Sequence, residues 1–146
     1  LDYVKKTITE GRVANMPPMA AAVGSAEDVK NVANYVLSLS GSAHNAAAAQ
    51  LGKEKFATCA ACHGPEGKGT QAVGAPNLTD KIWRFDGSLE GIKQTITYGV
   101  NMGGDSRDAV MPNFTEAGKL TPAEIKKLAV YVYKLGGGQA DAVAKK

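Results

Sequence analysis

The only two cysteines of the chain lie in one pentapeptide, Cys59-Ala60-Ala61-Cys62-His63. A C-x-x-C pair by itself serves a redox disulfide, a structural disulfide or half of a zinc site. A structural zinc site needs four ligands, and outside the pentapeptide the sequence offers only His44 and no second C-x-x-C pair. A thioredoxin-like redox site should follow a strand, and no strand-like segment precedes Cys59. Both alternatives therefore lack part of what they need.

The same pentapeptide has the spacing of covalent haem attachment, C-x-x-C-H. Two thiols one helical turn apart can each add to a vinyl group of the porphyrin, and the adjacent imidazole reaches the iron from the same face. We therefore predict that Cys59 and Cys62 hold one haem c and that His63 is an axial ligand of its iron. The zinc and disulfide interpretations stay open as minor alternatives.

A methionine is the expected second axial ligand, because His/Met ligation suits an electron carrier of raised potential. Met111 is favoured: Pro112 follows it, and it lies in an irregular segment before a predicted helix. Met102 stands beside two glycines and is a poorer anchor. We interpret His44 as a solvated surface residue. The alternative role for each methionine is to fill the apolar core, which is the usual role of this residue type.

Helical patterns dominate the rest of the chain and predict an all-α fold with three main helices. The first covers roughly 46–62, where alanine, glutamine, lysine and glutamate favour helix. The second covers about 88–98, with leucine and isoleucine on one side. The third begins with Thr121 as N-cap, Pro122 at the first position and Glu124 three residues after the cap, and it ends at a run of glycines from Gly136.

Composition excludes several classes of protein. The chain has 146 residues, of which 44% are hydrophobic and 21% charged, so it can bury a core and is not a disordered tail. Its formal net charge of +3 comes without a basic cluster, which argues against a nucleic-acid partner. No apolar run approaches the roughly 20 residues that cross a bilayer.

With these features the chain resembles class I cytochrome c over residues 46–138. In that family the first and last helices cross through a glycine–aromatic contact, which corresponds to Gly52 and Phe56 against Leu128 and Tyr131. The family's proline loop corresponds to Gly74-Ala75-Pro76-Asn77-Leu78. The resemblance implies that the Pro76 carbonyl accepts a hydrogen bond from the imidazole of His63 and so belongs to the cofactor-binding set.

An internal repeat precedes this domain. Four blocks recur in the same order: residues 4–11 match 92–99, Met16-Pro17 matches Met111-Pro112, 25–28 match 121–124, and 35–39 match 131–135. Residues 1–41 therefore resemble the C-terminal half of a second cytochrome c domain, with Met16 as its axial methionine and its C-x-x-C-H half missing. We expect a linker at 42–45, a complete domain at 46–138 and a flexible tail at 139–146.

About 41 residues cannot bury a sufficient core. We therefore expect a truncated, cleaved or partial two-haem protein, with a second haem only where the missing half is supplied. Further phrases, including Trp83 after the proline loop, resemble the diheme cytochrome c subunit (subunit III) of cbb-type haem-copper oxidases.

That resemblance implies a non-enzymatic electron-transfer subunit in the bacterial periplasm, relaying electrons from a donor cytochrome to the catalytic subunit of the oxidase. It also implies that the parent protein is held in the inner membrane by an anchor upstream of this chain. The alternatives are a freely soluble c-type electron shuttle and, less favoured, a haem peroxidase or gas-binding sensor.

Overall fold

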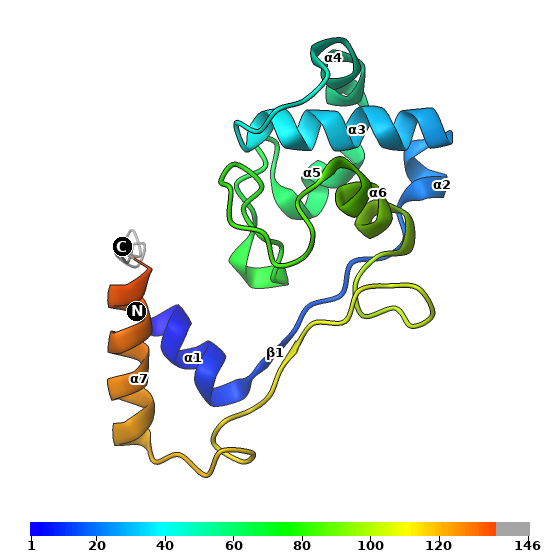
Figure 1. Ribbon diagram of the computed structural model, residues 1–146. Helices are drawn as coiled ribbons and strands as arrows, with labels where there is room; N and C mark the ends of the chain where they lie inside the picture. Colours follow the sequence, from blue (N-terminus) through cyan, green and yellow to red (C-terminus); the bar gives the residue numbers. More distant parts are fainter. Residues whose placement is uncertain (137–146) are drawn as a thin grey trace. The chain divides into compact units, whose positions relative to one another are not determined.

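The computed structural model describes residues 1–136, and these are predominantly helical, as predicted. Two compact units form: unit 1 comprises Leu1–Val13 and the described part of Val110–Lys146, and unit 2 comprises Ala14–Ala109. The elements are α1 (Asp2–Glu10), β1 (Arg12–Val13), α2 (Ala20–Val23), α3 (Ala26–Leu39), α4 (Ala46–Lys55), α5 (Ala57–His63), the 3-10 turn η1 (Gln71–Val73), α6 (Leu89–Tyr98), β2 (Val110–Met111) and α7 (Pro122–Leu135) (Figure 1).

The predicted helix starts are present, because the capping residues act as their types suggest. Thr121 caps α7, and its side chain and that of Glu124 form a reciprocal capping box. α6 begins after Ser88, whose hydroxyl accepts from the backbone N–H of Gly91. The helix predicted over 46–62 is instead two consecutive helices, α4 and α5, which meet at Phe56.

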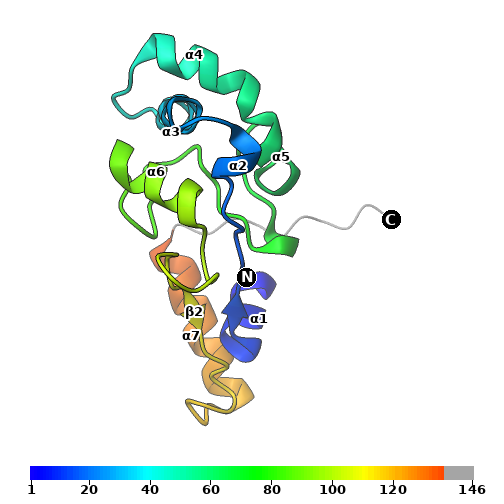
Figure 2. The same ribbon diagram turned by 90° about the vertical axis from the view of Figure 1, so that its right-hand side faces the viewer.

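In unit 2, α3 lies between α4 and α6 (Figures 1 and 2). α3 starts with its own capping box, formed by Ser25 and Asp28. The apolar core of the unit gathers around this helix and consists of Val23, Val29, Val32, Ala33, Val36, Leu37, Phe56, Ile92 and Ile96. α3 is therefore the central helix of the unit that contains Cys59 and His63.

Gly52 allows the close approach of α4 to α3. A Cβ at this position would lie 2.0 Å from the carbonyl oxygen of Asn31 and 2.7 Å from the backbone nitrogen of Val32. One turn along, the rings of Tyr35 and Phe56 meet edge to face with centroids 5.1 Å apart. Gly52 and Phe56 thus make a glycine–aromatic contact, and their partner is α3.

The helix that makes this contact differs from the expectation. Leu128 and Tyr131 of α7 were the expected partners, whereas Val32 and Tyr35 of α3 occupy these positions in the structure. Each lies 96 residues before its expected counterpart, which is the offset of the internal repeat. The two helices carry the same apolar pattern, so either sequence suits the contact.

Unit 1 contains α1 packed on α7 and a two-stranded antiparallel pairing of β1 with β2, in which Arg12 faces Met111. Its small buried cluster comprises Ile8, Ile125 and Ala129, and Met111 and Phe114 pack against that cluster. The backbone N–H of Phe114 donates to the carbonyl of Ile8 at 3.1 Å. This unit therefore combines α1 with α7, which are the first and last helices among residues 1–136.

The compact units and the domains expected from the repeat have different boundaries. The expected domains divide the chain at the linker 42–45, which in the structure joins α3 to α4 inside unit 2. The division by repeat stays a prediction about how the sequence is organised. The expected tail at 139–146 lies outside the described residues.

Candidate haem-binding site

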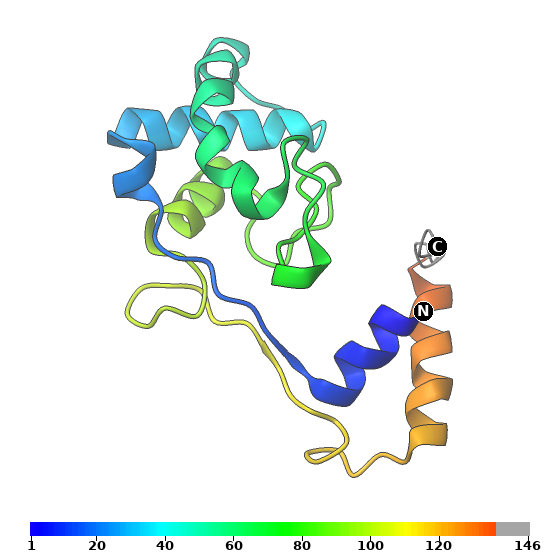
Figure 3. The ribbon, with the colours of Figure 1, turned by 180° about the vertical axis from the view of Figure 1, so that it is seen from behind.

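The C-x-x-C-H motif forms the short helix α5, which ends at His63. Gly64 follows with φ of +79°, a conformation that ends the helix. Both thiols are free, Cys59 half-buried and Cys62 exposed. Their spacing of three residues puts them on one side of the helix, one turn apart. α5 and the segment after it lie in front in Figure 3.

His63 is buried, with 8% of its surface exposed. Its Nδ1–H donates to the Pro76 carbonyl at 3.1 Å, the hydrogen bond that the resemblance implied. Burial lowers the pKa of His63, although the hydrogen bond to Pro76 acts in the opposite direction. The imidazole is therefore kept neutral, with Nδ1 engaged and Nε2 left to bind a metal.

The segment after α5 is folded tightly enough to bring Pro76 back to His63. The backbone N–H of Gly69 donates to the His63 carbonyl at 2.8 Å, and that of Leu78 donates to the Gly67 carbonyl at 2.7 Å. Gly69 has φ of +83°, and a Cβ there would lie 2.6 Å from the carbonyl oxygen of Ala75. Glycine is thus required at this turn for steric reasons.

The cysteines do not have the character of a redox pair. Burial raises the pKa of the Cys59 thiol, and the neighbouring Cys62 raises it further. A thiol-exchange nucleophile needs the opposite shift. Within residues 1–136 no three His, Cys, Asp or Glu side chains gather as a metal site.

The methionine candidates fall in different units. Met16 and Met19 belong to unit 2 with His63, whereas Met111 belongs to unit 1. Met102 is 49% exposed. His44 is exposed too, and its Nδ1 pairs with the Ser42 carbonyl at 2.8 Å. Of the four methionines, Met16, Met19 and Met102 share a compact unit with the buried imidazole, and Met111 does not.

These residues fit haem c. Two unpaired thiols stand one helical turn apart, and the neutral imidazole next to them is oriented by a backbone carbonyl. Leu78 and Trp83 pack against the buried cluster of unit 2, as do Cys59 and Ala60. The Cys59 thiol therefore lies beside an apolar surface of the kind that a porphyrin requires.

The sequence profile of the family "Cytochrome c" matches residues 49–136. The chain belongs to the cytochrome c family. The family carries covalent haem c and transfers electrons, so this chain is an electron-transfer protein and not itself an enzyme.

Known relatives share most of this chain. It is 58% identical over 134 residues to the cbb3-type cytochrome c oxidase subunit CcoP of Rubrivivax gelatinosus, covering 92% of this chain and 41% of that protein. Identity is 42% over 135 residues to CcoP of Cereibacter sphaeroides, covering 91% and 43% respectively. For the subunit FixP of Azorhizobium caulinodans it is 44% over 149 residues, covering 95% and 47%. The chain thus spans less than half the length of these relatives.

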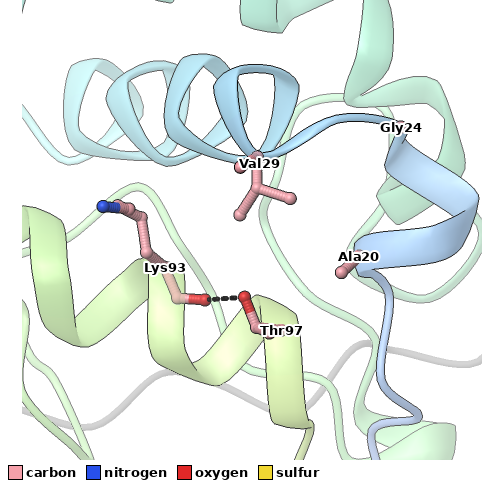
Figure 4. A pocket seen from close by; sticks show the side chains of 6 residues that line it. Ala20, Gly24, Val29, Lys93 and Thr97 are labelled. Carbon is pink, nitrogen blue, oxygen red and sulfur yellow. Dashed lines mark hydrogen bonds between the residues drawn. The ribbon is translucent and has the colours of Figure 1, made fainter.

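No helix among residues 1–136 is long and apolar enough to cross a bilayer. An open pocket of unit 2 lies between α2, α3 and α6, away from the C-x-x-C-H motif; its lining residues are Ala20, Gly24, Ala26, Val29, Lys93 and Thr97 (Figure 4). The Thr97 hydroxyl donates a hydrogen bond to the Lys93 carbonyl of its own helix, at 2.7 Å. This pocket adds no polar group to the haem-binding site.

Sequence reasoning did not assign the α3 face that covers α4 to this site. Val32 is fully buried and Tyr35 contacts the Phe56 ring. The signal that identifies these residues is the repeat, which equates them with Leu128 and Tyr131. Because the repeat alone does not indicate which copy covers α4, the sequence does not predict this contact.

Proposed function

We propose that this cytochrome c relays electrons from a donor cytochrome to the catalytic subunit of a cbb-type haem-copper oxidase in aerobic respiration. The haem, when bound, supplies a one-electron Fe(III)/Fe(II) couple. The protein's part is to attach the cofactor through Cys59 and Cys62, to ligate it and to exclude water. The oxidase assignment draws on the similarity of the chain to the CcoP and FixP subunits of cbb3-type oxidases.

The observation that carries the proposal is the hydrogen bond from buried His63 to the Pro76 carbonyl. It selects the tautomer whose Nε2 carries the lone pair, and it restrains the rotation of the ring. A fixed ligand needs little rearrangement when the iron changes its charge, which suits a carrier. A peroxidase or gas sensor instead needs an open or labile sixth position.

A methionine is the proposed sixth ligand, because a thioether favours the reduced iron and raises the potential. Met111 is the candidate from the order of the predicted helices, and Met16 is its counterpart in the repeat. Phe56 and Ile96, which are buried, and Leu78 and Val100, which are half-buried, supply an apolar surrounding that raises the potential further.

The proposed location is the bacterial periplasm, with the parent protein attached to the inner membrane. Docking to redox partners would be transient and small, below about 1,200 Å². The formal charge of +3 falls to about +1 once two ionised propionates of one haem are included, so long-range steering by net charge is weak. One haem belongs to this chain, and a second enters the proposal only with the other half of the first domain.

Covalent haem attachment can be tested by producing the chain in cells that carry the haem c maturation machinery. Intact mass should rise by one haem, and Cys62→Ser, which changes one attachment atom, should lose the stable two-thioether product. Potentiometric titration should then give one reversible one-electron step. Absence of attached haem in the unmodified chain would refute the proposed function.

Rapid mixing of the reduced chain with a cbb-type oxidase tests the partner. We expect reoxidation to be faster with this oxidase than with a haem-copper oxidase that lacks a cytochrome c subunit of this kind. Equal rates would favour a freely soluble shuttle. Rapid CO binding or peroxide turnover by the unmodified chain would favour the sensor or the peroxidase.

A further inference from the structure

Ile82 is the most exposed large apolar side chain among residues 1–136, with 83% of its surface in solvent. It lies in the irregular segment 80–88, between the proline loop and α6. A single exposed apolar residue is ordinary on a protein surface. Ile82 differs from that ordinary case because the backbone around it is fixed and because unpaired cations stand beside it.

Two aspartates fix the ends of the segment. The Ile82 N–H donates to Oδ1 of Asp80 at 3.0 Å, which forms a local turn at the exposed side chain. At the other end, the backbone N–H and the hydroxyl of Ser88 each donate to Asp86 at 2.8 Å. The hydrogen bond from the Ser88 backbone is the main cause that lowers the pKa of Asp86. Both carboxylates are thus occupied inside the segment.

Two aromatic side chains anchor the middle of the segment. Trp83 packs against the buried cluster of unit 2. Gly87 lies so close to its indole ring that a Cβ there would meet Cδ1 at 2.4 Å. Phe85 is half-buried, and the guanidinium carbon of Arg107 lies 5.8 Å from the centroid of its ring. The segment is therefore held in one conformation without any partner.

The two cations of the segment are not used inside the protein. Lys81 and Arg84 are both exposed, and neither forms an ion pair within the part of the chain that the structure describes. The aspartates nearest to them in the sequence accept the hydrogen bonds described above. The segment therefore presents an exposed isoleucine flanked by two unpaired positive charges.

From these observations we propose that the segment 80–88 is a docking element. Ile82 enters an apolar pocket of a partner protein, and Lys81 and Arg84 meet carboxylates around that pocket. The partner is the cbb-type oxidase, so the inference rests on the proposed function. A few buried anchor side chains supply most of the binding energy of an interface, and charges at its rim raise the association rate. Because the segment is already ordered, binding costs little conformational entropy.

A lipid surface suits the segment less well than a protein does. Attachment to anionic lipid uses clusters of about four to eight lysines or arginines. The segment has only Lys81 and Arg84, and two aspartates stand among them. Interfacial anchoring also uses exposed tryptophan or phenylalanine, whereas Trp83 is packed against the buried cluster. A protein pocket requires only one apolar anchor and matched charges.

The test measures binding of the haem-loaded chain to a cbb-type oxidase from which its own subunit of this kind has been removed. Ile82→Ala should weaken binding about 10-fold, because most of the apolar area of the anchor is lost. The double variant Lys81→Gln, Arg84→Gln should slow association at low salt and flatten its dependence on ionic strength. Both variants should keep the absorption spectrum and the midpoint potential of the unmodified chain.

Leu51→Ala and Lys53→Gln are the matched controls, and both lie on α4. Leu51 is 62% exposed, and Lys53 is an exposed cation that forms no ion pair among residues 1–136. We expect both variants to bind the oxidase like the unmodified chain. Equal weakening by Leu51→Ala and Ile82→Ala would overturn the docking element, and so would unchanged binding of Ile82→Ala.

Two further readouts separate docking from other roles of the same residue. A shifted midpoint potential in Ile82→Ala would place this side chain at the haem and would overturn the docking role. Vesicles that contain phosphatidylglycerol provide the second readout. Loss of vesicle binding in Ile82→Ala, with oxidase binding intact, would assign the segment to the membrane instead.

The unmodified chain distinguishes failure of this inference from failure of the proposed function. If it binds and reduces the oxidase and the segment variants do so equally well, the docking element alone is wrong. If the unmodified haem-loaded chain neither binds nor reduces the oxidase, the proposed function is wrong, and the docking element fails with it.

Discussion

Gly52→Ala should destabilise unit 2, although alanine favours helix over glycine by about 1 kcal/mol. The added methyl group would lie 2.0 Å from the Asn31 carbonyl oxygen and 2.4 Å from its carbon, both backbone atoms of α3. Ordinary C···O contacts are about 3.3–3.6 Å, so α3 and α4 must separate by about 1.3 Å or more. No rotamer change can relieve a clash with backbone atoms.

The size of the effect follows from that separation. Val32, Tyr35 and Phe56 form the contact between the helices, and burial of such side chains is worth about 2 kcal/mol each, or about 6 kcal/mol together. A gap of about 1 Å forfeits up to half of the contact energy, about 3 kcal/mol. After the helix-propensity gain of about 1 kcal/mol, the net loss is about 2 kcal/mol.

Urea unfolding of the haem-loaded chain, followed by far-UV circular dichroism, measures this loss. With a slope of about 1–3 kcal/mol per molar urea, the midpoint should fall by about 1 M. Gly136→Ala is the control, because φ of Gly136 is −83° and the nearest atom to its added methyl is the Val132 carbonyl oxygen at 3.8 Å. Its midpoint should barely move. A Gly52→Ala chain as stable as the unmodified one would refute the helix contact described above.

Three further predictions concern the closing helices. Val32→Ala should lower the free energy of unfolding by about 2 kcal/mol, because this side chain has no exposed surface. Leu128→Ala should lower it by less than about 1 kcal/mol, because Leu128 is 41% exposed. The reverse order in urea unfolding would contradict the packing of α3 on α4. Ser25→Ala removes the hydroxyl that accepts from the Asp28 N–H and should cost about 1 kcal/mol by the same assay, while no change would contradict the capping box. Hydrogen bonds from the backbone N–H and hydroxyl of Ser25 hold the pKa of Asp28 below its usual 3.8, so its ionised form stabilises the fold above about pH 4 and this contribution disappears as the pH falls through the lowered pKa. Asp28→Asn should therefore flatten the fall of Tm between about pH 5 and pH 3, and an unchanged slope would contradict the reasoning.

Local sequence predicted the parts of the site that depend on neighbours in the chain. Thr121, Pro122 and Glu124 specify a helix start because each satisfies the first turn by itself. Cys59, Cys62 and His63 are predicted as a set because their chemistry depends on spacing within one helical turn. The bond from His63 to Pro76 spans 13 residues, and family resemblance rather than pattern supplied it.

The sequence does not predict two details of the structure. The break between α4 and α5 at Phe56 follows no proline or glycine at that residue, and the helical composition continues through it. Met16 and Met111 are both half-buried, and the packing of Met111 against the buried cluster of unit 1 depends on contacts with distant parts of the chain. Residue type and spacing carry no information on such contacts.

What the sequence determines by itself is an all-α cytochrome c with one complete haem-attachment motif and two copies of a methionine segment followed by a closing helix. It cannot decide which copy closes over Gly52, because α3 and α7 have equivalent caps and equivalent apolar faces. Only the tertiary structure makes that choice, through long-range packing that buries Val32 and leaves Leu128 partly exposed. The physical reason is that two nearly equivalent helices suit the same contact with Gly52 and Phe56, and the difference lies in the sum of many small contacts rather than in any local signal.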